Sequence, residues 1–349
     1  SLVMKLYWLK IVFVFCVVTI LLGFRSTNLS FPSYFPKPVY DFNSNQLSDK
    51  KIALGRMLFY DTRLSKNNSI SCASCHSSYN AFAHTDHNLS HGINDIQGRR
   101  NAPALFNLAW QNSFMWDGAV HHLDMQPLAP ISHSDEMGSS IQEVVLKLNQ
   151  EPLYLDWFKA AFNDSIITGE YVLKALSQFQ LTLISANSKY DQYVRGEVNL
   201  NSKEHKGLSL FEKHCNSCHK APLFSSYEYK NNGLTIDSIL LDYGRFEITK
   251  NEADALLFKV PSLRNLSFTY PYMHDGRYRY LKEVINHYDA LDTQNIILSK
   301  DLKKSFKLSH EDKINLTAFL LTLNDTSFVF NTAHQYPKAL YNIQKTNFN

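Results

Sequence analysis

Hydrophobic residues recur at helical spacing in three long stretches of the chain, at residues 141–162, 170–195 and 311–323. Side chains three and four positions apart share one face of a helix, so each stretch predicts an amphipathic helix. Strict alternation of apolar and polar residues, which indicates a half-buried strand, is scarce. Residues 225–256 have little periodicity of either kind and are predicted to be loop. We therefore expect a mostly α fold.

The N-terminus carries a different pattern, a nearly unbroken apolar run from Ile11 to Phe24 that follows Lys5 and Lys10. Basic residues before a short apolar core are typical of an export signal. We expect residues 1–25 to be an export signal or a membrane anchor. The protein would then be periplasmic, either free or anchored to the inner membrane by this segment. The proline-containing residues 26–44 are predicted to form an extended linker.

One segment of the chain occurs twice, because residues 102–118 align without a gap to residues 260–276, with seven of seventeen positions identical. Upstream of each copy the pattern Gly-x-x-Leu-Phe begins at Gly55 and at Gly207. This repeat predicts two related domains that arose by internal duplication. The expected parts after the linker are an N-terminal domain at 45–198, a C-terminal domain at 199–330 and a tail at 331–349.

Composition narrows the range of functions. The 349 residues carry a formal net charge of +3 with both signs interspersed, so the chain lacks the basic stripe that nucleic-acid binding requires. The chain is long enough for two domains with sizeable cores. It has five cysteines, and four of them fall in two short motifs.

Both motifs read Cys-x-x-Cys-His. They comprise Cys72, Cys75 and His76 in the first copy, and Cys215, Cys218 and His219 in the second. A four-cysteine zinc site would leave both histidines unused, and a thioredoxin-like dithiol expects an alternating βαβ context that neither motif has. In a c-type haem site the thiols become thioethers and the histidine becomes the proximal iron ligand. We predict two covalently bound c-type haems in two cytochrome-c-like domains.

The two copies differ after their shared Asp-Gly. The first half continues with Gln126 and Glu136, and the second continues with His287 and Tyr288. Two identical haem sites would suit a simple electron carrier. Unlike surroundings predict that the two haems have different tasks.

With these motifs, residues 45–325 resemble the bacterial dihaem cytochrome c peroxidases, whose superfamily includes the tryptophylquinone-maturing dihaem enzymes. The resemblance implies that the N-terminal haem is the peroxide site and that Gln126 and Glu136 line its distal pocket. Cleaving peroxide needs a group that moves a proton from the inner to the outer oxygen, which a carboxylate above the iron can do. The resemblance also places Trp116 between the haems, where it could relay electrons.

The same resemblance implies one calcium ion between the domains. Family members bind it through an asparagine side chain and the backbone carbonyls of a Thr-x-Pro segment. The matching residues are Asn101, Thr269 and Pro271. Oxygen ligands of this kind suit calcium.

The chain departs from the typical peroxidase at the first haem. A Gly-His-Gly in those enzymes supplies a histidine that blocks the peroxidatic iron until the other haem is reduced. This chain has Ile93 at that position, and isoleucine cannot ligate iron. We expect an accessible iron that needs no reductive activation, unless His84, His87 or His91 substitutes as the ligand.

A second departure concerns the other haem. Typical peroxidases supply methionine where this chain has Tyr288, and the quinone-maturing branch has tyrosine there. A thioether raises the haem potential, whereas an anionic phenolate should lower it. Met273 and His287 are rival ligands of the same iron.

The leading interpretation is an exported dihaem peroxidase. It would reduce hydrogen peroxide to water with electrons from a small cytochrome c or cupredoxin, and it would touch the membrane only through its N-terminal segment. One alternative is a protein-modifying oxidase of the quinone-maturing type, as Tyr288 and Trp116 suggest. Another is a non-enzymatic dihaem electron carrier, for which Gln126 and Glu136 would be incidental.

Overall fold

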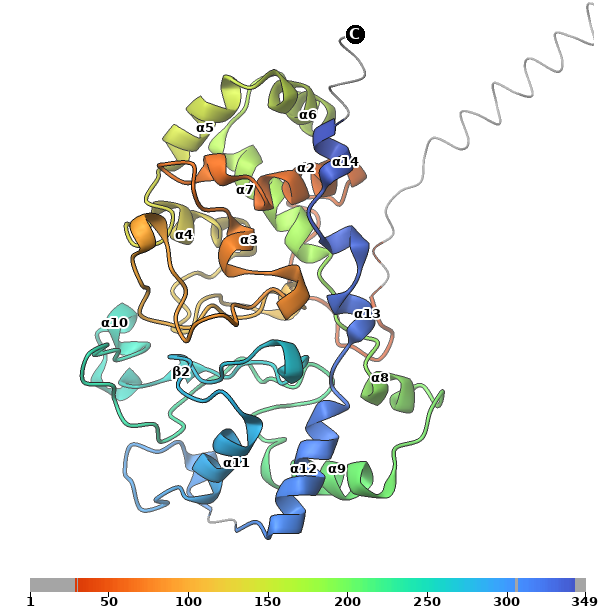
Figure 1. Cartoon of the computed structure of the whole chain (residues 1–349), viewed down its shortest axis with the longest axis vertical. Coiled ribbons are helices and arrows are strands. Elements are labelled where there is room, and N and C mark those ends of the chain that lie inside the picture. Colours follow the sequence, from red (N-terminus) through yellow and green to blue (C-terminus); the bar gives the residue numbers. More distant parts are fainter. Residues whose placement is uncertain (1–28, 30, 305–306, 343–349) are drawn as a thin grey trace, which may run out of the picture.

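The computed structural model describes residues 29, 31–304 and 307–342, so the predicted export segment at 1–25 lies outside the described residues. The described chain is mostly helical, as predicted, and its one named sheet has two strands (Figure 1). Those strands, β1 (Tyr229–Lys230) and β2 (Phe258–Lys259), pair antiparallel. Within the described ranges no helix is both long and apolar enough to cross a membrane.

Figure 1 shows two halves, one above the other. In chain order the first helices are α2 (Asp49–Phe59), α3 (Cys72–Cys75), α4 (Leu128–Ser132), α5 (Ile141–Asn149), α6 (Pro152–Phe162), α7 (Gly169–Leu181) and α8 (Lys189–Val194). Those that follow are α9 (Ser202–His214), α10 (Phe246–Thr249), α11 (Leu281–Asp289), α12 (His310–Leu321), α13 (Thr326–Val329) and α14 (Lys338–Asn342). Helix α8 lies beside the lower half, whereas α13 and α14 run back along the upper half.

Two of the predicted long helices are interrupted. The stretch 141–162 breaks between α5 and α6 because Pro152 cannot donate a backbone hydrogen bond and restricts Glu151, which is extended. The stretch 170–195 ends its first helix at Leu181 and resumes only at α8, whose N-terminus Ser188 caps. The third prediction is confirmed, since α12 covers most of 311–323.

The same helix pair organises each half: α2 packs on α7, and α9 packs on α12. The closest approach falls at the glycine of each Gly-x-x-Leu-Phe pattern. A Cβ atom at Gly55 would overlap the backbone carbonyl of Ala175, and one at Gly207 would overlap that of Asn315. Only glycine allows the helices to lie so close together, which explains the residue at both positions.

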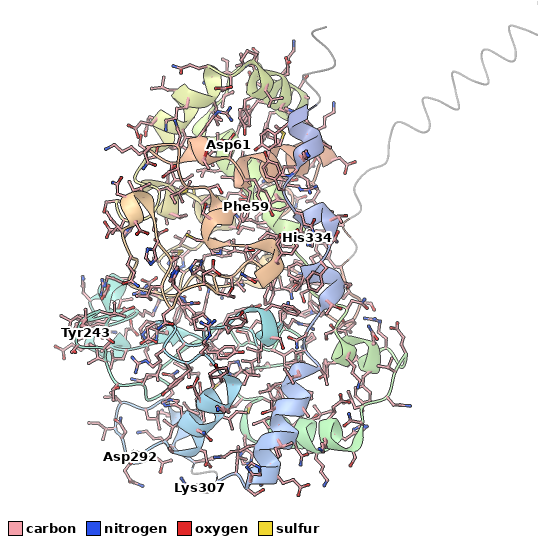
Figure 2. All side chains as sticks on the ribbon, viewed as in Figure 1. Phe59, Asp61, Tyr243, Asp292, Lys307 and His334 are labelled. Atoms are coloured by element: carbon pink, nitrogen blue, oxygen red, sulfur yellow. The ribbon has the colours of Figure 1, made fainter. Side chains whose placement is uncertain are left out.

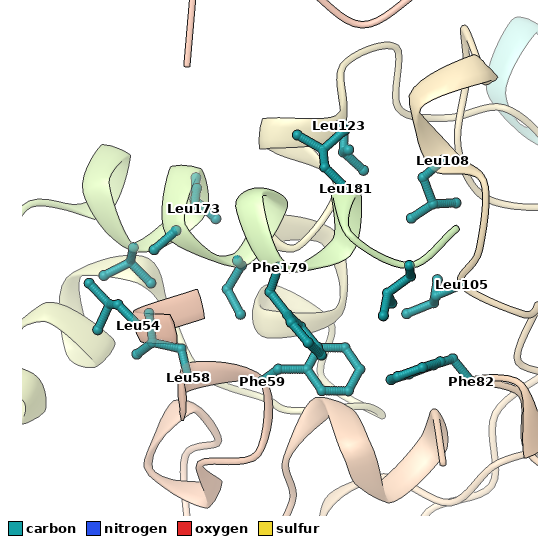
Figure 3. Close-up of a cluster of buried hydrophobic side chains, with 14 of the residues drawn as sticks. Leu54, Leu58, Phe59, Phe82, Leu105, Leu108, Leu123, Leu173, Phe179 and Leu181 are labelled. Carbon is teal, nitrogen blue, oxygen red and sulfur yellow. The ribbon is translucent and has the colours of Figure 1, made fainter. Parts of the chain in front are cut away.

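Each half is centred on three buried phenylalanines. In the upper half they are Phe59, Phe82 and Phe179, which meet among the leucines of the core (Figure 3), with ring centroids 5.2–6.2 Å apart. In the lower half they are Phe211, Phe224 and Phe319, with centroids 5.1–6.3 Å apart. The buried hydrophobic side chains accordingly form two clusters, one for each half.

The repeated Pro-x-Leu-x-Asn-Leu segments also adopt matching conformations. Asn107 and Asn265 are both left-handed, and each accepts a backbone hydrogen bond through its side-chain oxygen. The donors are the amides of Ser185 and Asp325, at 2.9 and 2.8 Å, each just beyond the long helix of its half. These buried asparagines fix the chain at both crossings between the halves.

The C-terminal residues return to the upper half. Tyr60 donates a hydrogen bond to the carbonyl of His334, and the side chain of Arg56 binds the carbonyls of Thr332 and Gln335. Figure 2 shows Phe59 and His334 together in this half, far from Asp292 and Lys307 at the lower end. The tail therefore braces α2, the helix that precedes the first cysteine motif.

Candidate active site

The first Cys-x-x-Cys-His motif forms α3 and the residue that ends it. Nδ1 of His76 lies 2.8 Å from the carbonyl oxygen of Phe82. Because a carbonyl can only accept, Nδ1 carries the proton and Nε2 keeps a free lone pair. Burial lowers the pKa of His76 to about 4, so the ring is neutral, as a metal-bound imidazole must be.

Both cysteines of this motif are free thiols. Burial raises the pKa of Cys72 to about 12 and also raises that of Cys75, so both remain protonated at neutral pH. Two free thiols beside a neutral imidazole with an available Nε2 are the groups that covalent attachment of a c-type haem uses.

The second motif repeats this arrangement in the lower half. Nδ1 of His219 lies 3.1 Å from the carbonyl oxygen of Pro261 and 3.3 Å from that of Phe224. Burial lowers the pKa of His219 to about 4, and Cys215 and Cys218 are free thiols. Among the described residues no three His, Cys, Asp or Glu side chains are grouped to hold a metal ion.

Gln126 and Glu136 flank the short helix α4. The backbone after Glu136 folds back along this helix, with the amide of Met137 donating to the carbonyl of Pro130 at 3.2 Å. Burial raises the pKa of Glu136, partly offset by His133. The Glu136 charge in turn adds to the burial that raises the pKa of Cys75, which places this carboxylate near the first haem motif.

The loop around Ile93 packs against the backbone of Glu136. The amide of Ile93 donates to the carbonyl of Glu136 at 2.7 Å, and the isoleucine side chain is buried. Three histidines precede it in a row, with ring centroids 5.8 Å apart for His84 and His87 and 4.9 Å apart for His87 and His91. His91 binds Asp95 at 2.6 Å, whereas Nε2 of His84 is buried without a partner.

Trp116 lies where the two halves meet. Its indole N–H donates to the carbonyl of Asn101 at 2.8 Å, and its own carbonyl accepts from the amide of Lys259 at 2.7 Å. Asn101 belongs to the first half, and Lys259 lies on β2 of the second. The predicted relay residue is therefore hydrogen-bonded to both sides of the junction.

The predicted calcium ligands come from both sides of the same junction. The buried Asn101 donates its backbone amide to the carbonyl of His274 at 2.7 Å, beside the turn that carries Thr269 and Pro271. Its side-chain nitrogen donates to the carbonyl of Asn88 at 3.0 Å, which leaves the amide oxygen as the free group. An amide oxygen and backbone carbonyls fit the needs of a calcium ion.

Tyr288, on α11, faces the second cysteine motif. Burial raises the pKa of Tyr288 to about 12, and the charges of Cys215 and Cys218 add to the rise. His287 points elsewhere, since its Nε2 donates to the carbonyl of Asn232 at 2.9 Å. The neighbouring tyrosine, rather than the histidine, is thus placed toward the second motif.

Three features of the site were missed by sequence reasoning. Asn232 contacts two of the rival ligands, and its only local signal is the Asn-Gly turn. Lys259 buries its ammonium group at the junction, where it donates to the carbonyl of Ser113. Arg264 forms a fully buried ion pair with Asp191 at 2.7 Å. Each depends on contacts between distant segments, which hydrophobic periodicity cannot reveal.

Comparison with known proteins gives a consistent result. Residues 49–199 match the sequence pattern of the family described as "Di-haem cytochrome c peroxidase". The chain is 34% identical over 300 residues to the methylamine utilization protein MauG of Methylophilus methylotrophus, covering 84% of this chain and 87% of the relative. It is 36% identical over 275 residues to the cytochrome c551 peroxidase of Nitrosomonas europaea, covering 77% and 78%.

A solved structure is similar over nearly the whole chain. It is a MauG-like protein associated with microbial copper homeostasis, with a TM-score of 0.82 and 31% identity, covering 90% of this chain and all of the other. A mostly helical chain with two Cys-x-x-Cys-His sites of this geometry belongs to the class of c-type cytochromes. Within that class, the chain belongs to the dihaem cytochrome c peroxidase and MauG family. Membership implies two c-type haems and supports an oxidoreductase activity of the dihaem peroxidase type.

Proposed function

We propose that this protein is an exported dihaem peroxidase, which reduces hydrogen peroxide to two molecules of water with two electrons and two protons. The observation that carries the proposal is the half-buried Glu136 beside the first haem motif, with its pKa raised by partial burial. A carboxylate placed above the iron can accept a proton from peroxide and return it. An electron carrier has no use for such a group.

The chain would divide into a peroxidatic domain at 45–198 and an electron-transfer domain at 199–330, with a tail at 331–349. We infer that the two arose by duplication of one haem unit. The paired glycines, Gly55 and Gly207, support this origin, as do the two phenylalanine clusters and the matching histidine contacts.

The peroxide chemistry belongs to the first half. When bound at His76, a haem supplies the iron that binds peroxide and exchanges electrons. Glu136 would accept the proton of the inner peroxide oxygen at its carboxylate and deliver it to the outer oxygen, which leaves as water. Gln126 would line the same pocket from the other side of α4. Ile93 offers no ligand, so peroxide would reach this site without reductive activation.

The electron path would begin at the second half. A small redox protein, either a cytochrome c or a cupredoxin, would reduce the haem at His219. Trp116 would then carry electrons across the junction, which its hydrogen bonds to both halves support. We propose Tyr288 as the sixth ligand of the second haem, and one calcium ion held by Asn101, Thr269 and Pro271.

The location follows from the N-terminal sequence. Residues 1–25 would direct export to the periplasm, as a signal or as an inner-membrane anchor. Both c-type haem attachment and a soluble redox donor are expected in that compartment.

A second candidate is a protein-modifying oxidase of the quinone-maturing type. Two observations favour it: Tyr288 faces the second motif, and the chain is 34% identical to a MauG protein. The oxidised product distinguishes the two candidate functions. A peroxidase oxidises a reduced redox protein at a high rate, whereas the alternative oxidises aromatic side chains of a partner, which mass spectrometry of that partner would detect.

The test of the proposed function is peroxide turnover by Glu136→Gln in the haem-loaded protein, with reduced cytochrome c as the electron source. We expect turnover to fall roughly tenfold or more, the low end of what a positioned acid–base group contributes being about a hundredfold. Asp135→Asn, the neighbouring carboxylate, is the matched control and should retain turnover. Wild-type rates in Glu136→Gln would remove this residue from the mechanism.

A further inference from the structure

Asn232 lies among the three rival ligands of the second haem. It follows β1 and makes two separate contacts with them. Its side-chain nitrogen donates to the sulfur of Met273 at 3.5 Å, within range for a sulfur acceptor, and its backbone carbonyl accepts from Nε2 of His287 at 2.9 Å. One residue therefore hydrogen-bonds both groups that compete with Tyr288 for the second haem iron.

The segment that carries Asn232 is held firmly in place. Asn231 is joined to Ser299 by two hydrogen bonds, because its amide donates to the serine hydroxyl at 2.8 Å and its carbonyl accepts the serine amide at 3.1 Å. The side chain of Asn231 also accepts the amide of Gly233 at 2.8 Å, and this glycine has a φ of +79°. The turn therefore presents both the side chain and the carbonyl of Asn232 to the site.

Tyr288 is the rival that Asn232 leaves available. The structure gives Asn232 a hydrogen bond to Met273 and another to His287, the two groups that compete with Tyr288. Asn232 thus restrains two candidates and leaves the phenol of Tyr288 as the third.

We propose that Asn232 is a positioning residue that selects Tyr288 as the sixth ligand of the second haem, by holding the Met273 sulfur with its side chain and His287 with its carbonyl. This inference rests on the proposed haem site but not on peroxide turnover. Met115 and Met273 are equivalent in the repeat, and in the part of the chain that the structure describes an asparagine side chain donates to Met273 but not to Met115.

Mutation can separate the two hydrogen bonds of Asn232, because one uses its side chain and the other its backbone carbonyl. Asn232→Leu keeps the backbone carbonyl, and with it the bond to His287, but removes the side-chain nitrogen. The variant should therefore release Met273 alone. In the haem-loaded full chain we expect resonance Raman modes of iron-bound phenolate to weaken, a thioether-to-iron absorption band to appear, and the potential of the second haem to rise.

Two further variants make the test decisive. Asn232→Leu combined with Met273→Leu should restore phenolate ligation, because the released competitor is gone. Tyr288→Phe should abolish the phenolate modes while leaving Asn232 intact. Covalent haem content of each variant reports whether the second half has folded.

The outcomes are distinct. Phenolate modes and a potential unchanged in folded Asn232→Leu would overturn the selection by Asn232. A wild-type protein with methionine or histidine on the second iron would overturn it as well, because Asn232 would then not restrain either group. Absence of peroxide turnover in wild type would contradict the proposed peroxidase and would leave these spectra to decide the role of Asn232.

Discussion

The two halves of the molecule share a frame and differ in what surrounds the haem motif. Each frame has a glycine between crossed helices, three buried phenylalanines and a histidine whose Nδ1 donates to a phenylalanine carbonyl. The first half adds the half-buried Glu136, and the second adds Tyr288 with Asn232. The shared packing gives both haem motifs the same framework. The residues that follow Asp-Gly differ between the halves and give each haem its own surroundings.

Removing one haem at a time should give the largest difference between the two halves. Cys72→Ala with Cys75→Ala should lose one of two covalent haems and all peroxide turnover, because the proposed proton donor serves that site alone. The matched pair, Cys215→Ala with Cys218→Ala, should also lose one haem but still react with peroxide in a single turnover. Haem staining and stopped-flow absorbance measure both. Single-turnover reactivity in the first pair would reverse the assignment of the halves.

The next effect is on the pH dependence of turnover. Glu136 must be ionised to accept a proton, so turnover should rise with pH through its pKa, which burial raises above the ordinary value of about 4.3. Asp135 raises this pKa further, so Asp135→Asn should move the acid limb of kcat/KM to lower pH. In Glu136→Gln the acid limb of the kcat/KM profile should be absent. An unchanged limb in both variants would assign it to another group.

The shared frame can be tested at its paired glycines. Gly55→Ala and Gly207→Ala should each destabilise the protein by about 1–3 kcal/mol, because the added Cβ overlaps a helix carbonyl. Gly98→Ala is the control, since its Cβ would make only an ordinary contact at 3.5 Å. Thermal unfolding of the haem-loaded proteins measures the effect. If only one of the two glycines is needed, the halves are not packed alike.

The smallest effect concerns the junction. Burial lowers the pKa of Lys259 to about 7, and its ammonium donates to Gln111 at 2.9 Å and to Ser113 at 2.8 Å without a bound carboxylate. The unfolded chain binds its proton up to about pH 10. Above pH 7 the unfolded state therefore holds more protons than the native state, so stability should rise with pH over this window.

Lys259→Met should lack that rise. Denaturant midpoints at pH 6.5 and pH 9 would measure the difference, with Lys206→Met, at an exposed ion pair, as the control. A pH response in Lys259→Met equal to that of wild type would show that this amine is not buried in solution.

The sequence predicted the parts of this structure that depend on local pattern. The mostly α fold and the third long helix followed from spacing alone. The helix breaks at Pro152 and after Leu181 were missed because apolar periodicity continued across them. Asn232 was missed because its role depends on Met273 and His287, which lie 41 and 55 residues further along the chain.

Adding peroxide to the fully ferric protein, without pre-reduction, and following oxidation of reduced cytochrome c tests the proposed peroxidase activity most directly. We predict prompt turnover, because Ile93 offers no ligand to block the first iron. Turnover only after pre-reduction would mean that a histidine, such as His84 with its unpartnered Nε2, closes this site. No turnover in either state would contradict the assignment of this protein as a peroxidase.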